Sequence, residues 1–212
     1  MRDFPVFTTE NGVGSLVLKE IPYSGIAYVT IRDSASPTDF LEECVGFCRA
    51  VGAQKIYATG SKILEQYPLH TTVIRMAASF DCLPNTDACL FPVTDKTVAQ
   101  FREIYNDRMK DVDNAAYMSE LAGREMLKRG DGYFIHIDGH LLGIGMASDD
   151  RIDCVATVDR GKGRDIVCAL VHALVCERVV LDVASTNHKA IHLYESLGFV
   201  KTAEISCWYK II

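Results

Sequence analysis

Apolar residues after Pro92 recur at intervals of three and four, which is the spacing of one face of an α-helix. The first series consists of Val98, Phe101, Tyr105, Met109 and Val112. Thr94 precedes it at a position where a threonine can cap a helix. A second series starts at Met118 and stops near Gly130, a residue type that commonly ends helices. The pattern therefore predicts two consecutive helices.

The pattern then changes to that of strands. Residues 133–137 and 141–146 are apolar runs separated by the turn Asp138-Gly139, so we expect an antiparallel hairpin. Residues 152–158 predict a further strand. A loop containing two glycines follows and leads into a helix with one apolar face. That face consists of Ile166, Val167, Leu170, Val171, Leu174 and Val175.

Three more elements complete the carboxyl-terminal part of the chain. Residues 179–183 predict a buried strand, residues 187–197 a helix, and residues 200–212 a last extended segment. From residue 88 onward, the predicted order of elements is β-α-α-β-β-β-α-β-α-β.

The first 80 residues contain a shorter copy of this pattern. The predicted strand at 26–33 is similar in sequence to that at 152–159, and residues 55–58 are similar to residues 178–181. Where the second copy has glycines, the first has Ser34-Ala35-Ser36-Pro37. Either the chain contains a partial tandem repeat or two segments share common strand–helix patterning. In both cases we expect a structural amino-terminal lobe over 1–80 and a catalytic domain over 81–212.

Charge and composition exclude several classes of protein. Twenty-two Lys and Arg against 28 Asp and Glu give a net charge of −6, and no basic stripe alternates with aromatic residues, so we expect no nucleic-acid partner. No apolar run is long enough for a signal core or a membrane span, so we expect a cytoplasmic protein with no membrane partner. We further expect a monomer or homodimer. The eight cysteines include no C-x-x-C pair, which favours free thiols and no metal site.

The glycine loop is a candidate anion site. A loop between a strand and a helix directs backbone N–H groups at one point, where the helix dipole adds favourable potential for negative charge. Arg160, Lys162 and Arg164 surround Gly161 and Gly163, against the overall acidic trend of the chain. The alternative is a solvated basic loop, because short glycine motifs are common.

A second motif lies one strand later and has the sequence Asn187-His-Lys-Ala-Ile-His-Leu-Tyr194-Glu-Ser-Leu-Gly-Phe199. Together the two segments resemble the GCN5-related N-acetyltransferase superfamily. The pyrophosphate loop of that family reads Arg or Gln, two residues, Gly, one residue, then Gly or Ala, and its last helix reads Asn-x-x-Ala…Leu-Tyr-x-x-x-Gly-Phe. The resemblance implies an acyl-CoA N-acyltransferase fold of α/β (α+β) class. In that fold a mixed, mostly antiparallel central sheet is flanked by helices.

The resemblance also implies roles for single residues. The backbone of Val155, Ala156 and Thr157 would bind the pantetheine arm of acetyl-coenzyme A, and the loop from Arg160 to Arg164 its pyrophosphate. Asn187 would contact the cofactor or shape the acetyl pocket. Tyr194 matches the general acid that protonates the departing thiolate. The chain departs from the motif at Asp165, where Gly or Ala is usual; this carboxylate either repels the diphosphate or caps the helix start.

Two functions follow from the resemblance. The first is acetylation of a primary amine of a small molecule or peptide by direct attack in a ternary complex. Asp153 is then the first candidate for the base, ahead of His136 and Asp138, and residues 110–117 contribute to the choice of acceptor. The alternative is a catalytically impaired acyl-coenzyme A-binding or regulatory module, in which Asp165 marks lost catalysis.

Overall fold

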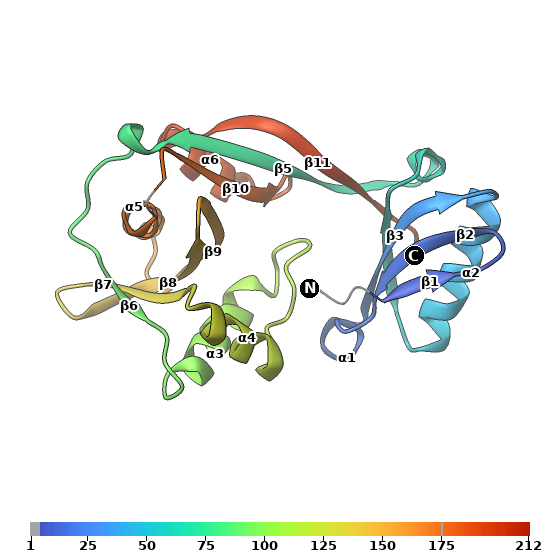
Figure 1. The fold of residues 1–212 in the computed structure, drawn as a ribbon, viewed down its shortest axis with the longest axis horizontal. Coiled ribbons are helices and arrows are strands. Elements are labelled where there is room, and N and C mark those ends of the chain that lie inside the picture. Colours follow the sequence, from blue (N-terminus) through green and yellow to red (C-terminus); the bar gives the residue numbers. More distant parts are fainter. Residues whose placement is uncertain (1–4, 175) are drawn as a thin grey trace. The chain divides into compact units, whose positions relative to one another are not determined.

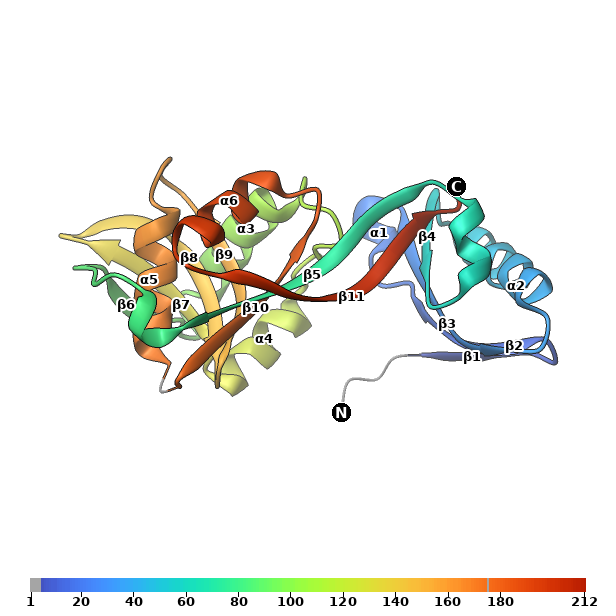
Figure 2. The ribbon, with the colours of Figure 1, turned by 90° about the horizontal axis from the view of Figure 1, so that it is seen from above.

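The computed structural model describes residues 5–174 and 176–212, which divide into two compact units. The first unit comprises the chain up to Val73 together with Glu204–Ile212, and the second comprises Ile74–Ala203. Figure 1 shows the elements of each unit, and β4 is labelled in Figure 2. Val175, which the sequence pattern assigned to a helix face, lies outside the described residues.

The sheet of the first unit has the strand order β1-β2-β3-β4-β11. β2 pairs antiparallel with β3, and β3 pairs parallel with β4, because α2 crosses over between them. Phe40, Leu41 and Cys44 of α2 are buried against this sheet. The elements up to β5 are β1 (Val6–Thr8), β2 (Gly12–Val17), α1 (Ile21–Ser24), β3 (Ile26–Ser34), α2 (Pro37–Ala50), β4 (Lys55–Thr59), η1 (Lys62–Gln66) and β5 (Leu69–Ser79).

The sheet of the second unit has the strand order β5-β10-β9-β8-β7-β6. The order of elements predicted from residue 88 onward is confirmed, as is the mixed, mostly antiparallel sheet flanked by helices. The elements are η2 (Phe80–Cys82), β6 (Cys89–Pro92), α3 (Val98–Met109), α4 (Glu120–Arg129), β7 (Gly132–Ile137), β8 (His140–Ser148), β9 (Arg151–Thr157), α5 (Gly163–Ala173), β10 (Arg178–Ala184), α6 (His188–Ser196) and β11 (Val200–Lys210).

The first half of the chain, up to the end of β5, and the second half, up to the end of β11, each end in a long strand. Each of these strands belongs partly to one unit and partly to the other. β5 begins in the first unit at Leu69 and ends in the second at Ser79, next to β10. β11 begins in the second unit at Val200 and ends in the first at Lys210, where it pairs antiparallel with β4. Figure 2 shows the course of both strands. This reciprocal exchange supports the partial tandem repeat.

The domain boundaries of the structure differ from those expected at residue 80. Glu204–Ile212 complete the first unit, whereas the sequence pattern assigned them to the catalytic domain. A pattern of apolar residues predicts where a strand lies but not which sheet it joins, so the exchange left no signal in the sequence.

Helices cover both faces of the second sheet. α5 and α6 contribute to one apolar core, which includes Leu170 and Tyr194, while α3 and α4 pack in another through Phe101 and Met126. α5 approaches β8 closely because Gly143 and Gly145 carry no side chain. A Cβ on Gly143 would lie 2.6 Å from the side chain of Ile166 in α5, and a Cβ on Gly145 would lie 2.4 Å from that of Leu170 in α5.

One helix start differs from the prediction. α3 begins at Val98 with Thr97 as its N-terminal flanking residue, and it ends at Met109, so Val112 lies beyond it. Thr94 lies in the preceding turn, where its carbonyl oxygen accepts hydrogen bonds from the N–H groups of Thr97 and Val98. The end of α4 agrees with the prediction, since Gly130 adopts the left-handed conformation that commonly ends helices.

The structure adds three observations on classes of site. Within the described residues, no helix combines the length and apolar character needed to span a membrane. Those same residues hold no group of three His, Cys, Asp or Glu side chains placed to bind a metal ion. The eight cysteines are free, and Cys44, Cys48, Cys154 and Cys168 are buried.

The contact between α5 and β8 gives a stability prediction. Replacing Gly143 by Ala forces a methyl group against the side chain of Ile166 in α5 and the backbone of Ala156 in β9, so we expect it to lower the free energy of unfolding by about 1–3 kcal/mol. Gly46, in α2, is the control, because nothing lies within 4 Å of its Cβ position. Gly46→Ala should raise stability by roughly 0.5–1 kcal/mol. Urea unfolding measures both variants, and equal effects would contradict the packing described here.

Candidate functional site

β9 and β10 separate part of the way along β9. Among the described residues they pair in parallel at Arg151 with Val180 and at Ile152 with Leu181, and no later pair is found. On its other side, β9 stays paired with β8 as far as Thr157. The two strands diverge beyond their last pair, Ile152 of β9 and Leu181 of β10. We call the opening between them the fork.

A β-bulge lies where the fork begins. Met146 of β8 pairs with Cys154, but the next residue, Ala147, pairs with Ile152, which leaves Asp153 as the extra residue of β9. A bulge bends a strand and increases its local twist. The bulge at Asp153 therefore provides a physical cause for the divergence of β9 from β10.

The fork exposes an unused edge of β9. The N–H of Val158 donates to the carbonyl oxygen of Leu142 at 2.8 Å, which fixes the direction of the backbone groups relative to β8. Because these groups alternate along a strand, those of Ala156 also point to β8, while those of Val155 and Thr157 point to the fork. An extended ligand could add here as a strand.

The first unit has no fork at the corresponding place. β3 and β4 pair without interruption from Ile26 and Lys55 to Thr30 and Thr59. The loop after β3 leads into α2 through Pro37, and the hydroxyl of Ser36 donates to the carboxylate of Asp39. Asp39 is the third residue of α2, as Asp165 is of α5, so the two loops differ in the glycines and basic residues that the first one lacks.

The two glycines of the second unit's loop serve different purposes. Gly161 has a φ of +80°, in the left-handed region that favours glycine, and its Cβ position faces open space. Gly163 is buried at the start of α5, where a Cβ would lie 2.7 Å from the side chain of Leu193 in α6. Gly163 therefore allows α5 and α6 to approach each other beside the fork.

The first turn of α5 presents backbone donors. Its first hydrogen bond runs from the N–H of Ile166 to the carbonyl oxygen of Lys162, so the N–H groups of residues 163–165 have no acceptor within the helix. Lys162 lies 3.8 Å from Asp165, measured from Nζ to Oδ2. Asp165 forms this ion pair and does not cap the helix, whereas Arg160 and Arg164 are exposed.

Asn187 has a clear structural role. Its side-chain oxygen accepts a hydrogen bond from the N–H of Ala190 at 3.2 Å, which caps α6. The Asn-x-x-Ala part of the motif thus has the geometry of a helix cap. Asn187 thereby fixes the start of the helix that carries Tyr194.

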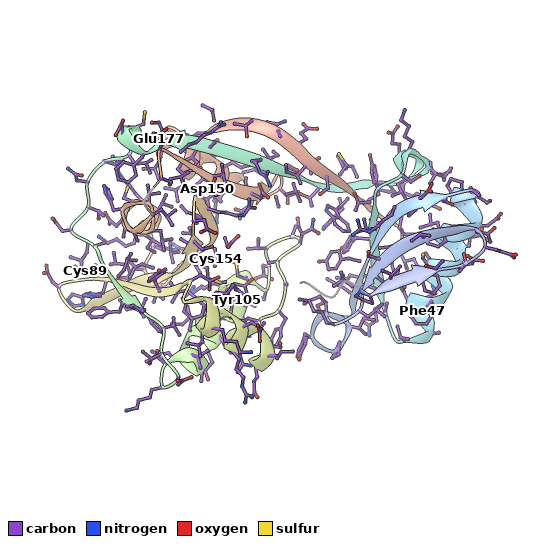
Figure 3. All side chains as sticks on the ribbon, in the orientation of Figure 1. Phe47, Cys89, Tyr105, Asp150, Cys154 and Glu177 are labelled. Atoms are coloured by element: carbon purple, nitrogen blue, oxygen red, sulfur yellow. The ribbon has the colours of Figure 1, made fainter. Side chains whose placement is uncertain are left out.

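Tyr194 lies in the core of the second unit. It is 8% exposed, and its ring centroid is 5.8 Å from that of Phe199. Burial raises the pKa of its phenol well above the ordinary value, and the nearby Cys154 on β9 adds to this shift. Figure 3 labels Cys154 on its strand. Burial, with a further contribution from Asp153, raises the pKa of the Cys154 thiol to about 12, so Cys154 is not a thiolate at neutral pH.

The three candidate bases lie in different surroundings. Asp153 lies at the bulge, where Arg151 Nε donates to its Oδ1 at 3.0 Å. His136 stacks on Phe91 with ring centroids 4.3 Å apart, and both of its ring nitrogens are buried without a hydrogen-bond partner among the described residues. Asp138 lies in the β7–β8 turn with a φ of +49°. Of the three, Asp153 is the candidate at the fork.

The structure brings together residues that are distant in sequence. A Cβ on Gly163 would lie 3.7 Å from the side chain of Thr157 and 2.7 Å from that of Leu193, so β9, α5 and α6 meet at one place. Sequence reasoning missed the ion pairs between Arg75, Asp182 and Arg151, because partners up to 107 positions apart follow no local pattern.

A separate hollow of about 300 Å³ lies between the last turns of α5 and the segment that leads into β6. Asn85, Thr86, Ala88, Leu90, Ala169, His172 and Ala173 line it. None of the residues proposed from the sequence contributes to this hollow, which is therefore distinct from the fork.

Comparisons with known proteins bear on the fold. No protein-family model matches the sequence, and no curated protein matches it. Solved structures do match. A GCN5-related N-acetyltransferase from Sphaerobacter thermophilus is 12% identical with a TM-score of 0.60, over 93% of this chain and 75% of that one.

Two further structures are similar over most of this chain. A tandem GNAT protein from the clavulanic acid biosynthesis pathway is 13% identical with a TM-score of 0.59, over 94% of this chain and 78% of that one. A putative acetyltransferase from Pyrococcus horikoshii is 12% identical with a TM-score of 0.59, over 94% and 68%. Identities this low establish the fold alone. The chain has the fold of the GCN5-related N-acetyltransferases, with a partial tandem repeat.

Proposed function

We propose that this protein is an N-acetyltransferase. It binds acetyl-coenzyme A in the fork and transfers the acetyl group to a primary amine of a small molecule or peptide, by direct attack in a ternary complex. The observation that carries the proposal is the fork itself, which is open in the second unit and closed in the first. The first unit is accordingly proposed to be structural.

The residues at the fork suit the cofactor. Val155 and Thr157 offer N–H and C=O groups to the amides of the pantetheine arm, which would lie along β9 as an added strand. The free N–H groups of residues 163–165, with Arg160 and Arg164, would hold the pyrophosphate. When bound, acetyl-coenzyme A supplies an acetyl group activated as a thioester.

Tyr194 is the proposed proton donor to the departing sulfur. The raised pKa of its phenol keeps it protonated throughout the neutral range, which a general acid requires before the reaction. Packing against Phe199 and the cap formed by Asn187 hold Tyr194 in place. Asp153 is the proposed acceptor of the proton that the attacking amine loses.

The thiol of Cys154 supports direct attack over a route through an acetylated cysteine. With a pKa of about 12, this thiol carries almost no thiolate at neutral pH. The thiolate is the nucleophilic form of cysteine. Transfer without a covalent enzyme intermediate is therefore the proposed route.

One observation favours the second candidate function, an acyl-coenzyme A-binding or regulatory module. Asp165 places a carboxylate in the first turn of α5, although Lys162 lies 3.8 Å away and offsets its charge. Calorimetry with acetyl-coenzyme A, followed by thiol release with a panel of amines, separates the two. Binding with turnover supports the enzyme, whereas binding without turnover by any amine supports the module.

The loop of the second unit gives the first functional prediction. In the double variant Arg160→Glu/Arg164→Glu, two anionic side chains face the pyrophosphate, so we expect the Kd for coenzyme A to rise by about 10- to 100-fold. Lys62→Glu, an exposed charge reversal in the first unit, is the control and should leave the Kd within about twofold. Calorimetry at fixed ionic strength makes the measurement, and equal effects would exclude a single site at this loop.

Tyr194 gives the second prediction. Tyr194→Phe removes the hydroxyl and keeps the ring, so binding of acetyl-coenzyme A should be retained while kcat falls by about 10- to 10,000-fold. Because its pKa is raised, Tyr194 stays protonated below pH ~10, and the ratio of wild-type to variant kcat should stay constant between pH 6 and 9. Steady-state kinetics test this where chemistry limits the rate. An unchanged kcat would leave water as the proton donor.

A further inference from the structure

Four charged residues from three strands form one network beside the fork. Arg75 on β5 donates from Nε and Nη2 to the two carboxylate oxygens of Asp182 on β10, at 2.9 and 3.0 Å. Arg151 on β9 also donates to Asp182, and its Nε donates to Asp153 at 3.0 Å. We call these four residues the ion network.

The network lies at the point where the two strands part. Arg151 belongs to the first of the two paired positions of β9 and β10, and Asp153 and Asp182 are the first residues of each strand beyond the last pair. Arg151 therefore bonds to a carboxylate on both sides of the fork. No backbone pair joins the two strands beyond this point among the described residues, so the side chains of Arg151 and Asp182 provide the connection nearest to the opening.

The geometry of the network favours a defined arrangement. The bond from Arg75 to Asp182 is bidentate, which fixes the carboxylate in orientation as well as in position. The Asp182 side chain is 19% exposed, which limits screening by water and salt. Burial opposes its ionisation, but the hydrogen bonds from Arg75 and Arg151 outweigh this, and the pKa of Asp182 lies below its ordinary value.

We propose that the ion network is a clamp that sets the width of the fork, with Asp182 and Arg75 as positioning residues for the binding of acetyl-coenzyme A. Arg75 holds Asp182, and Asp182 holds Arg151 across the fork. This inference rests on the proposed function for the identity of the ligand.

The clamp gives the first half of the chain a part in the site. Arg75 lies on β5, the last strand of the first half, within the stretch of that strand that belongs to the second unit. The strand exchange thus supplies a side chain that the second half of the chain does not contain.

The test compares Asp182→Asn with wild type. The variant keeps the shape of the side chain and removes the charge that both arginines bind. We expect the Kd and KM for acetyl-coenzyme A to rise by about tenfold while kcat and the KM for the amine change by less than about threefold. Glu125→Gln is the matched control, because it removes the exposed pair with Lys128 on α4. Its constants should equal those of wild type.

Hydrogen exchange of the ligand-free proteins provides a readout that does not depend on coenzyme A. In Asp182→Asn, the amides at the last paired positions of β9 and β10, residues 151–152 and 180–182, should exchange faster than in wild type, while those that join β7 to β8 should not change. Arg75→Lys, which keeps the charge but loses the bidentate geometry, should be intermediate in both measurements.

The outcomes separate the clamp from the proposed function. Unchanged exchange in Asp182→Asn would overturn the clamp even if wild type binds acetyl-coenzyme A. A rise in the KM for the amine alone would also overturn it, because the network would then belong to the acceptor site. If wild type fails to bind acetyl-coenzyme A while exchange accelerates as expected, the proposed function fails and the clamp on the fork stands.

Discussion

The incomplete pairing of β9 with β10 is the feature on which the functional account depends. Backbone N–H and C=O groups inside a sheet are normally paired, because an unpaired polar group shielded from water costs free energy. Here the two strands part after Ile152 and Leu181, and Val155 and Thr157 direct their backbone groups into the opening. A ligand with amides of its own would pair these groups. The bulge at Asp153, the glycine loop and the start of α5 all lie around this opening.

The two halves of the chain show how one pattern can keep or lose such an opening. In the first half, β3 and β4 are paired without interruption from Ile26 to Thr30, and Ser34-Ala35-Ser36-Pro37 take the place of the glycine loop. The first half nevertheless contributes to the second unit through β5, which lies next to β10 and carries Arg75. The exchange of β5 and β11 therefore makes each unit depend on both halves of the sequence.

The sequence predicted the order of elements in the second unit from residue 88 onward. Residues with local spacing were recognised, as with the turn at Asp138-Gly139 and the motif around Tyr194. Features that depend on partners far along the chain could not be predicted. The bulge at Asp153 follows from its register with β8, and the pairing of Arg75 with Asp182 joins positions 107 apart. Asn187 was recognised by its motif, but its role as the cap of α6 became apparent from geometry.

A structure of the protein with coenzyme A tests the central claim most directly. The account predicts one cofactor molecule per chain, with its pantetheine amides hydrogen-bonded to the backbone of Val155 and Thr157 and its pyrophosphate at the N–H groups of residues 163–165. A fork closed by direct pairing of β9 with β10, or coenzyme A bound against β3 and β4 of the first unit, would contradict it.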